Sequence, residues 1–174
     1  MIEGFSKKFI KICNNFDEYP QNFVLGLSGG VDSIALLILL KDFIEIHPRI
    51  DINIYPVIID HGLRYNSSAE ANSVKEYAKF LGFQTTVKKI IQKKNIGNIQ
   101  NWARIARRDL LCQSAFSLSA TLLLAHHSDD QVETVFMRLI KGSGIEGLLG
   151  MKDLHFWKGI FVSRPLLNFK KEDL

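Results

Sequence analysis

A strand, a glycine-rich turn and a helix follow one another between residues 23 and 40, and this order constrains the fold more than any other feature. The apolar run Phe23–Leu27 leads into Ser-Gly-Gly-Val-Asp-Ser at residues 28–33, and a second apolar run then continues to Leu40. A helix that begins on such a turn directs unpaired backbone N–H groups and the positive end of its dipole at the space above it. The two glycines let a phosphate approach the backbone because no Cβ intervenes. The pattern therefore predicts an anion site.

The same turn can also be read as an ordinary strand-to-helix connection with serine and aspartate caps. It is neither a Walker loop, since no Lys-Ser or Lys-Thr ends it, nor a Gly-x-Gly-x-x-Gly dinucleotide turn. A helix dipole contributes only about 0.3–1 kcal/mol to a bound anion, whereas millimolar binding needs about 4 kcal/mol. Several N–H and hydroxyl groups must therefore act together. The candidate binding residues are Ser28, Gly29, Gly30, Val31, Asp32 and Ser33, of which Asp32 can cap the helix or hold Mg²⁺.

The composition is that of one soluble domain spanning residues 1–174, with 47% hydrophobic and 23% charged residues. No apolar run is long enough to cross a bilayer and the N-terminus lacks a secretory signal, so we expect a cytoplasmic protein with no membrane partner. The two cysteines, Cys13 and Cys112, form no Cys-x-x-Cys pair for metal or redox chemistry. The net charge of +4 allows a nucleic-acid partner without requiring one.

Short β-branched runs alternate with longer helical patterns along the whole chain. This alternation predicts an α/β fold, a doubly wound and mainly parallel sheet with helices on both faces. We expect strands near Phe23–Leu27, Ile52–Ile59, Gln84–Ile90 and Thr121–Ala125, and helices near Ile2–Cys13, Ser33–Ile46, Ala69–Phe80, Gln100–Phe116 and Asp129–Ile140.

Polar segments stand where the predicted strands end, which is where ligands bind in sheets of this kind. Besides the turn at 28–33, these segments are Asp60–Arg64 and His126–Asp130. The pattern Ser67–Glu70 predicts a capping box at the start of the third helix, and Gly82 predicts its end. Loops are expected at 96–98 and in the glycine-rich stretch 142–150.

The segment His126–Thr134 gathers two histidines and three carboxylates directly after a predicted strand. Carboxylates in the first turn of a helix are ordinary complements of its dipole, but this number exceeds what capping needs. Zinc is disfavoured because adjacent histidines point apart and no third soft ligand lies nearby, whereas carboxylates beside a phosphate suit Mg²⁺. His127 and His61 can also be structural. The helical spacing predicts an apolar stripe made of Val132, Val135, Phe136, Leu139 and Ile140.

These residues resemble a known family. The 28–33 turn is similar to the PP-loop of adenylating enzymes that release pyrophosphate, and further segments narrow the resemblance to tRNA(Ile)-lysidine synthetases. Two positions depart from the pattern of that narrower family: Arg108 stands where it usually has Tyr, and Gln100 stands where it often has Glu. The resemblance covers about Phe23 to Leu174, and its most specific part runs from His126 to Met151. The segments that resemble tRNA(Ile)-lysidine synthetases in particular are Ile59–Arg64, Ala103-Arg104-x-x-Arg107, Ala125–Thr134, Arg138–Gly144, Gly147–Met151 and Arg164–Leu167.

The resemblance implies ATP-dependent formation of lysidine on the wobble cytidine of a tRNA(Ile) with a CAU anticodon. The C2 oxygen of the cytidine is adenylated with release of pyrophosphate, and the amine of free L-lysine then displaces AMP. The implied cofactors are ATP and Mg²⁺. The family usually carries further tRNA-binding domains, which we expect to be absent from this chain. The oligomeric state is not fixed by the sequence, and a homodimer stays open.

The resemblance also implies roles for individual residues. ATP would contact the 28–33 turn and His61, and Mg²⁺ would bind Asp32 and Asp129. Arg104 and Arg107 would act with Asp32 in catalysis, the arginines by opposing the charge that develops on phosphate. A lysine amine has a pKa near 10.4, so its neutral form at pH 7 costs about 4.6 kcal/mol and a carboxylate must accept the proton. Asp130 and Glu133 are the candidates for that step, and the substrate-binding set is His127, Asp129, Asp130 and Glu133.

Two other functions fit parts of the pattern. A related PP-loop enzyme that thiolates tRNA would need reactive or cluster-binding cysteines, which Cys13 and Cys112 do not provide. A non-enzymatic ATP-binding module would bind ATP without forming pyrophosphate, and it would have little use for the carboxylates between residues 129 and 133. Pyrophosphate release that depends on lysine and tRNA separates the synthetase from both.

Overall fold

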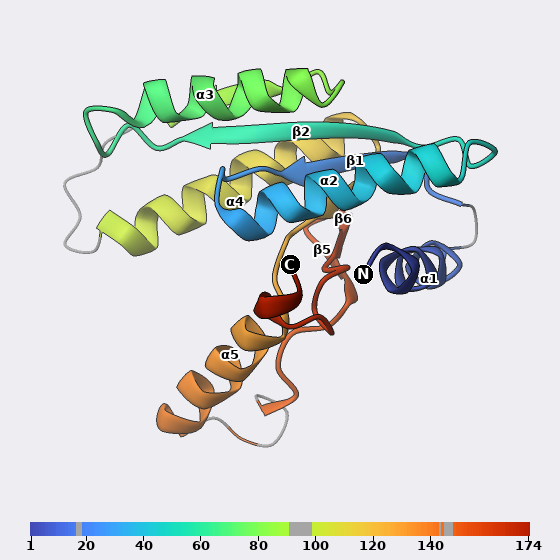
Figure 1. Cartoon of the computed structure of the whole chain (residues 1–174). Helices are drawn as coiled ribbons and strands as arrows, with labels where there is room; N and C mark the ends of the chain where they lie inside the picture. Colours follow the sequence, from blue (N-terminus) through green and yellow to red (C-terminus); the bar gives the residue numbers. More distant parts are fainter. Residues whose placement is uncertain (17–18, 91–98, 143, 145–147) are drawn as a thin grey trace.

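The computed structural model describes residues 1–16, 19–90, 99–142, 144 and 148–174. Its centre is a six-stranded sheet with the strand order β3-β2-β1-β4-β6-β5 (Figure 1). The strands are β1 (Asn22–Gly26), β2 (Asn53–Asp60), β3 (Thr86–Lys89), β4 (Thr121–Leu123), β5 (Leu154–Trp157) and β6 (Ile160–Ser163).

Helices cover both faces of this sheet, and one helix leaves it (Figure 1). Three helices, α1 (Ile2–Cys13), α2 (Val31–Ile46) and α3 (Ser67–Phe80), share one hydrophobic core. The opposite face is covered by α4 (Ile99–Ser117). Helix α5 (Ser128–Ile140) projects away from the sheet, and a short 3-10 helix (Lys171–Asp173) ends near the beginning of α5 (Figure 1).

The central strand β1 pairs in parallel with both β2 and β4. The parallel arrangement continues to β3 on one side and to β6 on the other, and β5 closes that edge as an antiparallel strand. Because α2, α3 and α4 each connect two parallel strands and lie on both faces, the predicted doubly wound sheet is confirmed. The carboxyl ends of β1, β2 and β4 therefore lie at one edge of the sheet.

Alternation along β1 divides the core into two layers. Phe23 and Leu25 face α1 and α2, where the ring of Phe9 lies 5.2 Å from that of Phe23 and 5.0 Å from that of Phe43. Val24, between them, packs against α4. Each fully buried side chain of this size contributes about 1.5–3 kcal/mol, so both layers hold β1 in place beneath the turn that follows it.

The β5–β6 hairpin was not among the predicted strands. Its strands are only four residues each, and their sequences lie in a stretch rich in charged and aromatic residues. The hairpin turns at Lys158 and Gly159, whose φ angles are 49° and 82°, and the glycine of this pair was the signal available in the sequence. Two consecutive residues with φ above zero form the tight turn that suits the twist of a hairpin.

Two local predictions are wrong. The apolar residues of α5 do not form a core stripe: Val132, Phe136 and Ile140 are 69%, 60% and 66% exposed, because α5 leaves the sheet. The capping box at residues 67–70 does not form, because α3 already begins at Ser67 with Asn66 as its N-cap, and the N-cap makes no side-chain hydrogen bond. The remaining exposed members of the predicted stripe are Leu139 and, in part, Val135.

Other local predictions are confirmed or fall outside the description. Gly82 ends α3 with a φ of 94°, and the N–H groups of Gly82 and Phe83 donate back to Lys79 and Ala78. The loop expected at 96–98 and residues 143 and 145–147 of the glycine-rich stretch lie outside the described residues. Within the described chain, no helix is long and apolar enough to cross a membrane.

Candidate functional site

The 28–33 turn is held by a set of hydrogen bonds among its own serines. Ser33 Oγ donates to the carbonyl of Gly30 at 2.9 Å and lies 3.0 Å from Ser28 Oγ. The backbone N–H of Ser28 donates to Ser33 Oγ, and that of Gly30 donates to Ser28 Oγ. These bonds fix the shape of the turn. In the first turn of α2 the N–H of Ser33 donates to the carbonyl of Gly30 at 3.1 Å, whereas the N–H groups of Val31 and Asp32 precede the first helical hydrogen bond.

Gly29 is the position in this turn that tolerates no side chain. Its φ angle is +79°, a conformation that L-residues rarely adopt. A Cβ placed there would lie 2.5 Å from Cγ2 of Val74 on α3. The turn therefore packs directly against α3, which the sequence pattern alone did not indicate.

A cleft of about 160 Å³ opens beside the turn, between the carboxyl ends of β1 and β2 and the start of α3. Its floor is apolar, with Leu27 and Ile59, and its rim is polar, with Ser28, His61 and Arg107. Burial lowers the pKa of His61, and the nearby charge of Arg107 lowers it further, so this imidazole is neutral at pH 7. The cleft joins an apolar surface to the 28–33 turn, as a site for a base and its phosphates requires.

The exit of β2 is fixed by Asp60, which is only 4% exposed. Its carboxylate accepts from Ser68 Oγ at 2.6 Å and from the N–H of Gly62 at 3.0 Å. The hydrogen bond from Ser68 is the main cause of the lowered pKa of Asp60. Asp60 thus stays ionised and anchors the segment that carries His61. This structural role was missed in the sequence analysis, where Ser68 was the available signal.

The start of α5 lies against the 28–33 turn through His127, which is only 3% exposed. Its Nε2 lies 3.7 Å from Oδ2 of Asp32 and 3.6 Å from Oδ2 of Asp130. The backbone N–H of His127 donates to the same oxygen of Asp130 at 2.9 Å, which caps the helix. The two constellations found in the sequence therefore meet at one place.

Asp32 has the donor set that a magnesium ion would use. Its Oδ1 is buried and has no hydrogen-bond partner, while Oδ2 faces His127. No cluster of three or more His, Cys, Asp or Glu side chains suited to a metal occurs in the described part of the chain. A single free carboxylate oxygen beside a phosphate site fits Mg²⁺, which commonly binds one or two carboxylates together with substrate phosphates.

The other predicted site residues lie around this centre at different depths. Asp129 is exposed and accepts from Ser128 Oγ at 3.1 Å, and Glu133 is exposed one turn farther along α5. Arg107 is partly buried, and burial together with the neighbouring Arg104 lowers its pKa, although it remains charged. The structure brings Asp32, His127 and Asp130 into contact, whereas no recorded contact joins Asp129 or Glu133 to the 28–33 turn.

Gln131 ties α5 to the segment before β5, a role that the sequence analysis missed. Its Nε2 donates to the carbonyl of Met151 at 2.9 Å, and its Oε1 accepts from the N–H of Met151 at 2.7 Å. Gly150 has a φ of +70°, and a Cβ there would lie 2.6 Å from Gln131 Nε2. Arg138 Nη1 donates to the carbonyl of Gly150. In the sequence, Gly150 and the amide side chain of Gln131 were the signals from which this link could have been predicted.

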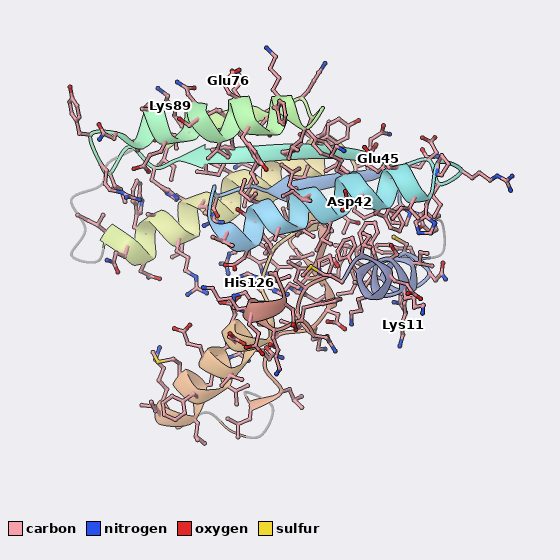
Figure 2. All side chains as sticks on the ribbon, viewed as in Figure 1. Lys11, Asp42, Glu45, Glu76, Lys89 and His126 are labelled. Atoms are coloured by element: carbon pink, nitrogen blue, oxygen red, sulfur yellow. The ribbon has the colours of Figure 1, made fainter. Side chains whose placement is uncertain are left out.

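Arg164 was read from the sequence only as part of a terminal motif, yet it lies beside the site. Its Nε donates to Nδ1 of His126 at 3.3 Å, and its Nη1 contacts the carbonyl of Lys152 and Nδ1 of His155. Burial lowers the pKa of His126 to about 4, and the charge of Arg164 contributes, so His126 is a neutral acceptor. Figure 2 shows His126 at the junction between the sheet and α5.

A parallel sheet with a glycine turn, an adjoining apolar cleft and a free carboxylate at one edge defines a nucleotide-binding α/β protein. Sequence comparison agrees with this class, since the whole chain, residues 1–174, matches the PP-loop domain. The chain belongs to the PP-loop domain family.

Curated relatives carry one common name. The chain is 40% identical over 168 residues to the tRNA(Ile)-lysidine synthase of Wolbachia pipientis wMel, covering 95% of this chain and 38% of that protein. It is 36% identical over 174 residues to that of Orientia tsutsugamushi, again covering 95% and 38%. For Bradyrhizobium diazoefficiens the identity is 41% over 155 residues, covering 87% and 42%. The chain thus spans about two fifths of the length of these relatives.

Solved structures confirm the fold. The U34-tRNA thiolase NcsA from Methanococcus maripaludis, solved with its iron–sulfur cluster, superposes with a TM-score of 0.77 at 19% identity, covering 99% of this chain and 61% of that one. An NAD+ synthetase from Burkholderia pseudomallei gives 0.62 at 14% identity, covering 98% and 63%. At these identities the likeness shows the shared fold alone.

Proposed function

We propose that this chain carries the catalytic site of a tRNA(Ile)-lysidine synthase, which adenylates the wobble cytidine of a tRNA(Ile) and then transfers L-lysine to it. The observation that carries the proposal is the contact between the 28–33 turn and the acidic start of α5 through His127, with Nε2 within 3.7 Å of Asp32 and 3.6 Å of Asp130. The relatives at 36–41% identity, all tRNA(Ile)-lysidine synthases, support it.

In this proposal ATP lies along the carboxyl edge of the sheet. Its base and ribose occupy the cleft beside Leu27 and His61, and its phosphates lie over the 28–33 turn. The neutral imidazole of His61 can donate or accept a hydrogen bond without repelling Arg107. Backbone N–H groups of the turn bind the β- and γ-phosphates that leave as pyrophosphate. Arg104 and Arg107 on α4 oppose the charge that develops at the α-phosphate.

Mg²⁺ would be held by the free oxygen of Asp32 and by phosphate oxygens, with Asp129 as a second candidate ligand. When bound, the ion would neutralise phosphate charge. The chain itself contributes His127, which lies between Asp32 and Asp130 and keeps both carboxylates near the reacting phosphates. The position of Asp32 thus depends on α5 as well as on α2.

The incoming lysine needs a carboxylate that binds its ammonium and accepts its proton. Asp130 already accepts the N–H of His127 at 2.9 Å, so it suits a positioning role. Glu133 is exposed on the same side of the helix start, and its carboxylate is accessible to a free amino acid. We therefore assign the proton-accepting role first to Glu133 and the orientation of the lysine to Asp130, with His127 and Asp129 beside them.

A thiolation activity on the same fold is not supported by the cysteines. Burial raises the pKa of Cys13 to about 11 and also raises that of Cys112. Both thiols are buried in different layers of the core. Neither is a reactive thiolate at neutral pH, and the two cannot share a cluster.

The test follows pyrophosphate release and lysidine formation in parallel. The chain is mixed with ATP, Mg²⁺, lysine and a tRNA(Ile) transcript with a CAU anticodon, and each component is omitted in turn. The proposal expects tRNA-dependent pyrophosphate release, followed by lysidine detected by mass spectrometry of the digested RNA. Glu133→Gln should slow lysidine formation more than pyrophosphate release, with Glu76→Gln on α3 as the matched control (Figure 2).

ATP binding without pyrophosphate release under all these conditions would contradict the synthetase and favour a binding module. Equal lysidine formation in Asp130→Asn, Glu133→Gln and the unchanged chain would remove both carboxylates from the mechanism. If the protein acts on tRNA as proposed, it works in the cytoplasm. Sedimentation of the same sample tests whether the chain forms a homodimer.

A further inference from the structure

A second cavity, of about 310 Å³, lies behind the nucleotide cleft between α4, α5 and the end of β6. Its floor is apolar and includes Leu122 and Leu124. Its walls carry guanidinium groups from three parts of the chain that are far apart in sequence. We call it the arginine chamber, and its basic residues are Arg104, Arg107, Arg108, Arg138 and Arg164, with His126 beside them.

The described lining of the arginine chamber carries several guanidinium groups and no carboxylate. The ion pairs of the described chain include none with Arg104, Arg107, Arg108 or Arg164. Asp130 lies close enough to His126 to act on its pKa, and its carboxylate already accepts from the N–H of His127.

Arg164 shows how the charge is accommodated in the absence of an acid. Its three recorded partners are all neutral: the carbonyl of Lys152, the Nδ1 of His126 and the Nδ1 of His155. The pKa of His126 is lowered to about 4, so this ring does not add a further positive charge at pH 7. Partly buried charges that contact only dipoles create a strong potential for an incoming anion.

Arg108 is, with Gln100, one of two positions at which this chain departs from the family pattern described above, and it lines the chamber. Its Cζ lies 4.2 Å from the ring centroid of Trp157, so the guanidinium makes a cation–π contact with the β5–β6 hairpin. A smaller cavity on the other side, lined by His155 and Trp157, shares both Arg108 and Arg164 with the chamber. The hairpin that the sequence did not predict therefore positions one of the guanidinium groups.

The chamber is adjacent to the nucleotide cleft, because Arg107 lines both cavities. The 28–33 turn lines only the cleft, so the two cavities offer separate anion sites on either side of one arginine. Guanidinium groups match phosphate oxygens in pairs, and they are the preferred partners of nucleic-acid backbones. A nucleoside that reacts at the cleft carries backbone phosphates on either side of it, and the chamber adjoins the cleft at Arg107.

We propose that the arginine chamber binds a phosphodiester of the RNA strand next to the nucleoside that reacts, with Arg108 and Arg164 as its principal contacts. This inference rests on the proposed function, since it concerns the same RNA substrate. It assigns Arg108 and Arg164 to the backbone of the strand, whereas Arg104 and Arg107 keep the role toward the α-phosphate of ATP that is proposed above.

The test measures binding of a fluorescein-labelled RNA stem–loop with a CAU loop to the full chain across a range of salt concentrations. Arg108→Gln should weaken binding roughly tenfold, because a charge-assisted contact is lost. It should also reduce the slope of log affinity against log salt by about 0.7, the value for one phosphate contact on single-stranded RNA. Arg108→Lys should keep most of the slope. Arg49→Gln, an exposed residue at the opposite end of the strands, is the matched control and should leave the slope as it is.

A slope for Arg108→Gln equal to that of Arg49→Gln overturns the inference, and so does a wild-type chain that binds no RNA. Circular dichroism of each variant checks that α4 is intact. If Arg108→Gln weakens binding of a non-hydrolysable ATP analogue as much as that of RNA, the chamber takes the triphosphate and the inference is wrong. Lysidine formation and tRNA-dependent pyrophosphate release by the unchanged chain are measured separately, so failure of the chamber and failure of the synthetase proposal give different results.

Discussion

Two helices of this protein begin directly after a parallel strand, α2 at the 28–33 turn and α5 at His127, and they are stabilised in opposite ways. The start of α2 is fixed by serine hydroxyls within the turn, by Val74 behind Gly29 and by two core layers around β1. The start of α5 is fixed by a buried histidine and by the Gln131–Met151 pair, while the rest of the helix is largely exposed.

The difference shows where each half of the site gets its precision. The turn that would hold the triphosphate is itself exposed at residues 28–31, but it joins the buried strand β1 to α2 and packs against Val74, so its shape is set by the core beneath it. The acidic group on α5 is placed by a few polar contacts, so single hydrogen bonds decide where its carboxylates lie. Substitutions that disturb the backbone of the first region, as at Gly29, should affect binding and stability together, whereas those that remove single polar groups should separate the two effects.

The largest effect is expected at Gly29. Gly29→Ala combines a strained φ of +79° with a contact of 2.5 Å to Val74, so the turn must move. We expect about 1–3 kcal/mol of lost stability and at least roughly a 100-fold loss of ATP-dependent turnover. Thermal unfolding and pyrophosphate release measure the two. Gly82→Ala is the matched control, with a φ of +94° and no atom within 4 Å, and it should lose stability alone. Normal turnover in Gly29→Ala would mean that the turn does not bind phosphate.

Asp32→Asn should affect chemistry and leave the fold intact. The buried Oδ1 without a partner loses its charge, so turnover should fall roughly 100-fold. The dependence of pyrophosphate release on Mg²⁺ concentration should shift upward. Asp42→Asn, on the same helix away from the turn, is the control (Figure 2). An unchanged Mg²⁺ dependence in Asp32→Asn would exclude Asp32 as a ligand.

Acid should destabilise the junction between the sheet and α5. The pKa of His126 is lowered from 6.5 to about 4, so between these values the unfolded chain binds a proton that the folded chain does not. Stability conferred by the neutral ring is complete above pH 6.5 and falls as the pH drops toward 4, by on the order of 2–3 kcal/mol. Denaturant unfolding at pH 7 and pH 4.5 measures the change. His126→Asn should flatten the difference, and an equally steep loss in that variant would assign it to other groups.

Gln131→Leu should loosen α5 without damaging the 28–33 turn. The backbone N–H and carbonyl of Met151 lose their hydrogen bonds to the Gln131 side chain, which lowers the free energy of unfolding by about 1–2 kcal/mol. Hydrogen exchange at the Met151 amide should become faster, and lysidine formation should fall more than pyrophosphate release. Gln113→Leu on α4 serves as the control. If both rates fall equally, the two helix starts are more strongly coupled than we infer.

The smallest effect is expected at Phe136, on the exposed face of α5. Phe136→Ala should change the free energy of unfolding by less than about 0.5 kcal/mol, since the ring is 60% exposed. Phe9→Ala, at 0% exposure, should cost about 3–5 kcal/mol. Chemical denaturation of both variants makes the comparison, and a large loss for Phe136 would mean that this face is covered in solution.

The sheet and its helices were predictable because periodicity reports burial against a sheet, as at Phe23–Leu27 and along α2. The same reasoning failed at Phe136 and Ile140, because a pattern of apolar residues does not state which surface receives them. The meeting of Asp32 with His127 followed from the rule that ligands lie at strand ends. The roles of Gln131 and Arg164 did not follow, since each depends on a backbone group or ring brought close by tertiary folding alone.

One hydrogen bond joins the last residues of the chain to the site. The first N–H of α5, from Ser128, donates to the carbonyl of Phe169 at 2.9 Å. A protein trimmed before Phe169 would leave that amide without its acceptor and would remove the neighbour that closes the helix end. Any shortened version made for crystallography or screening should therefore retain Phe169, because a boundary drawn at the final strand would alter the start of α5 and with it the candidate site.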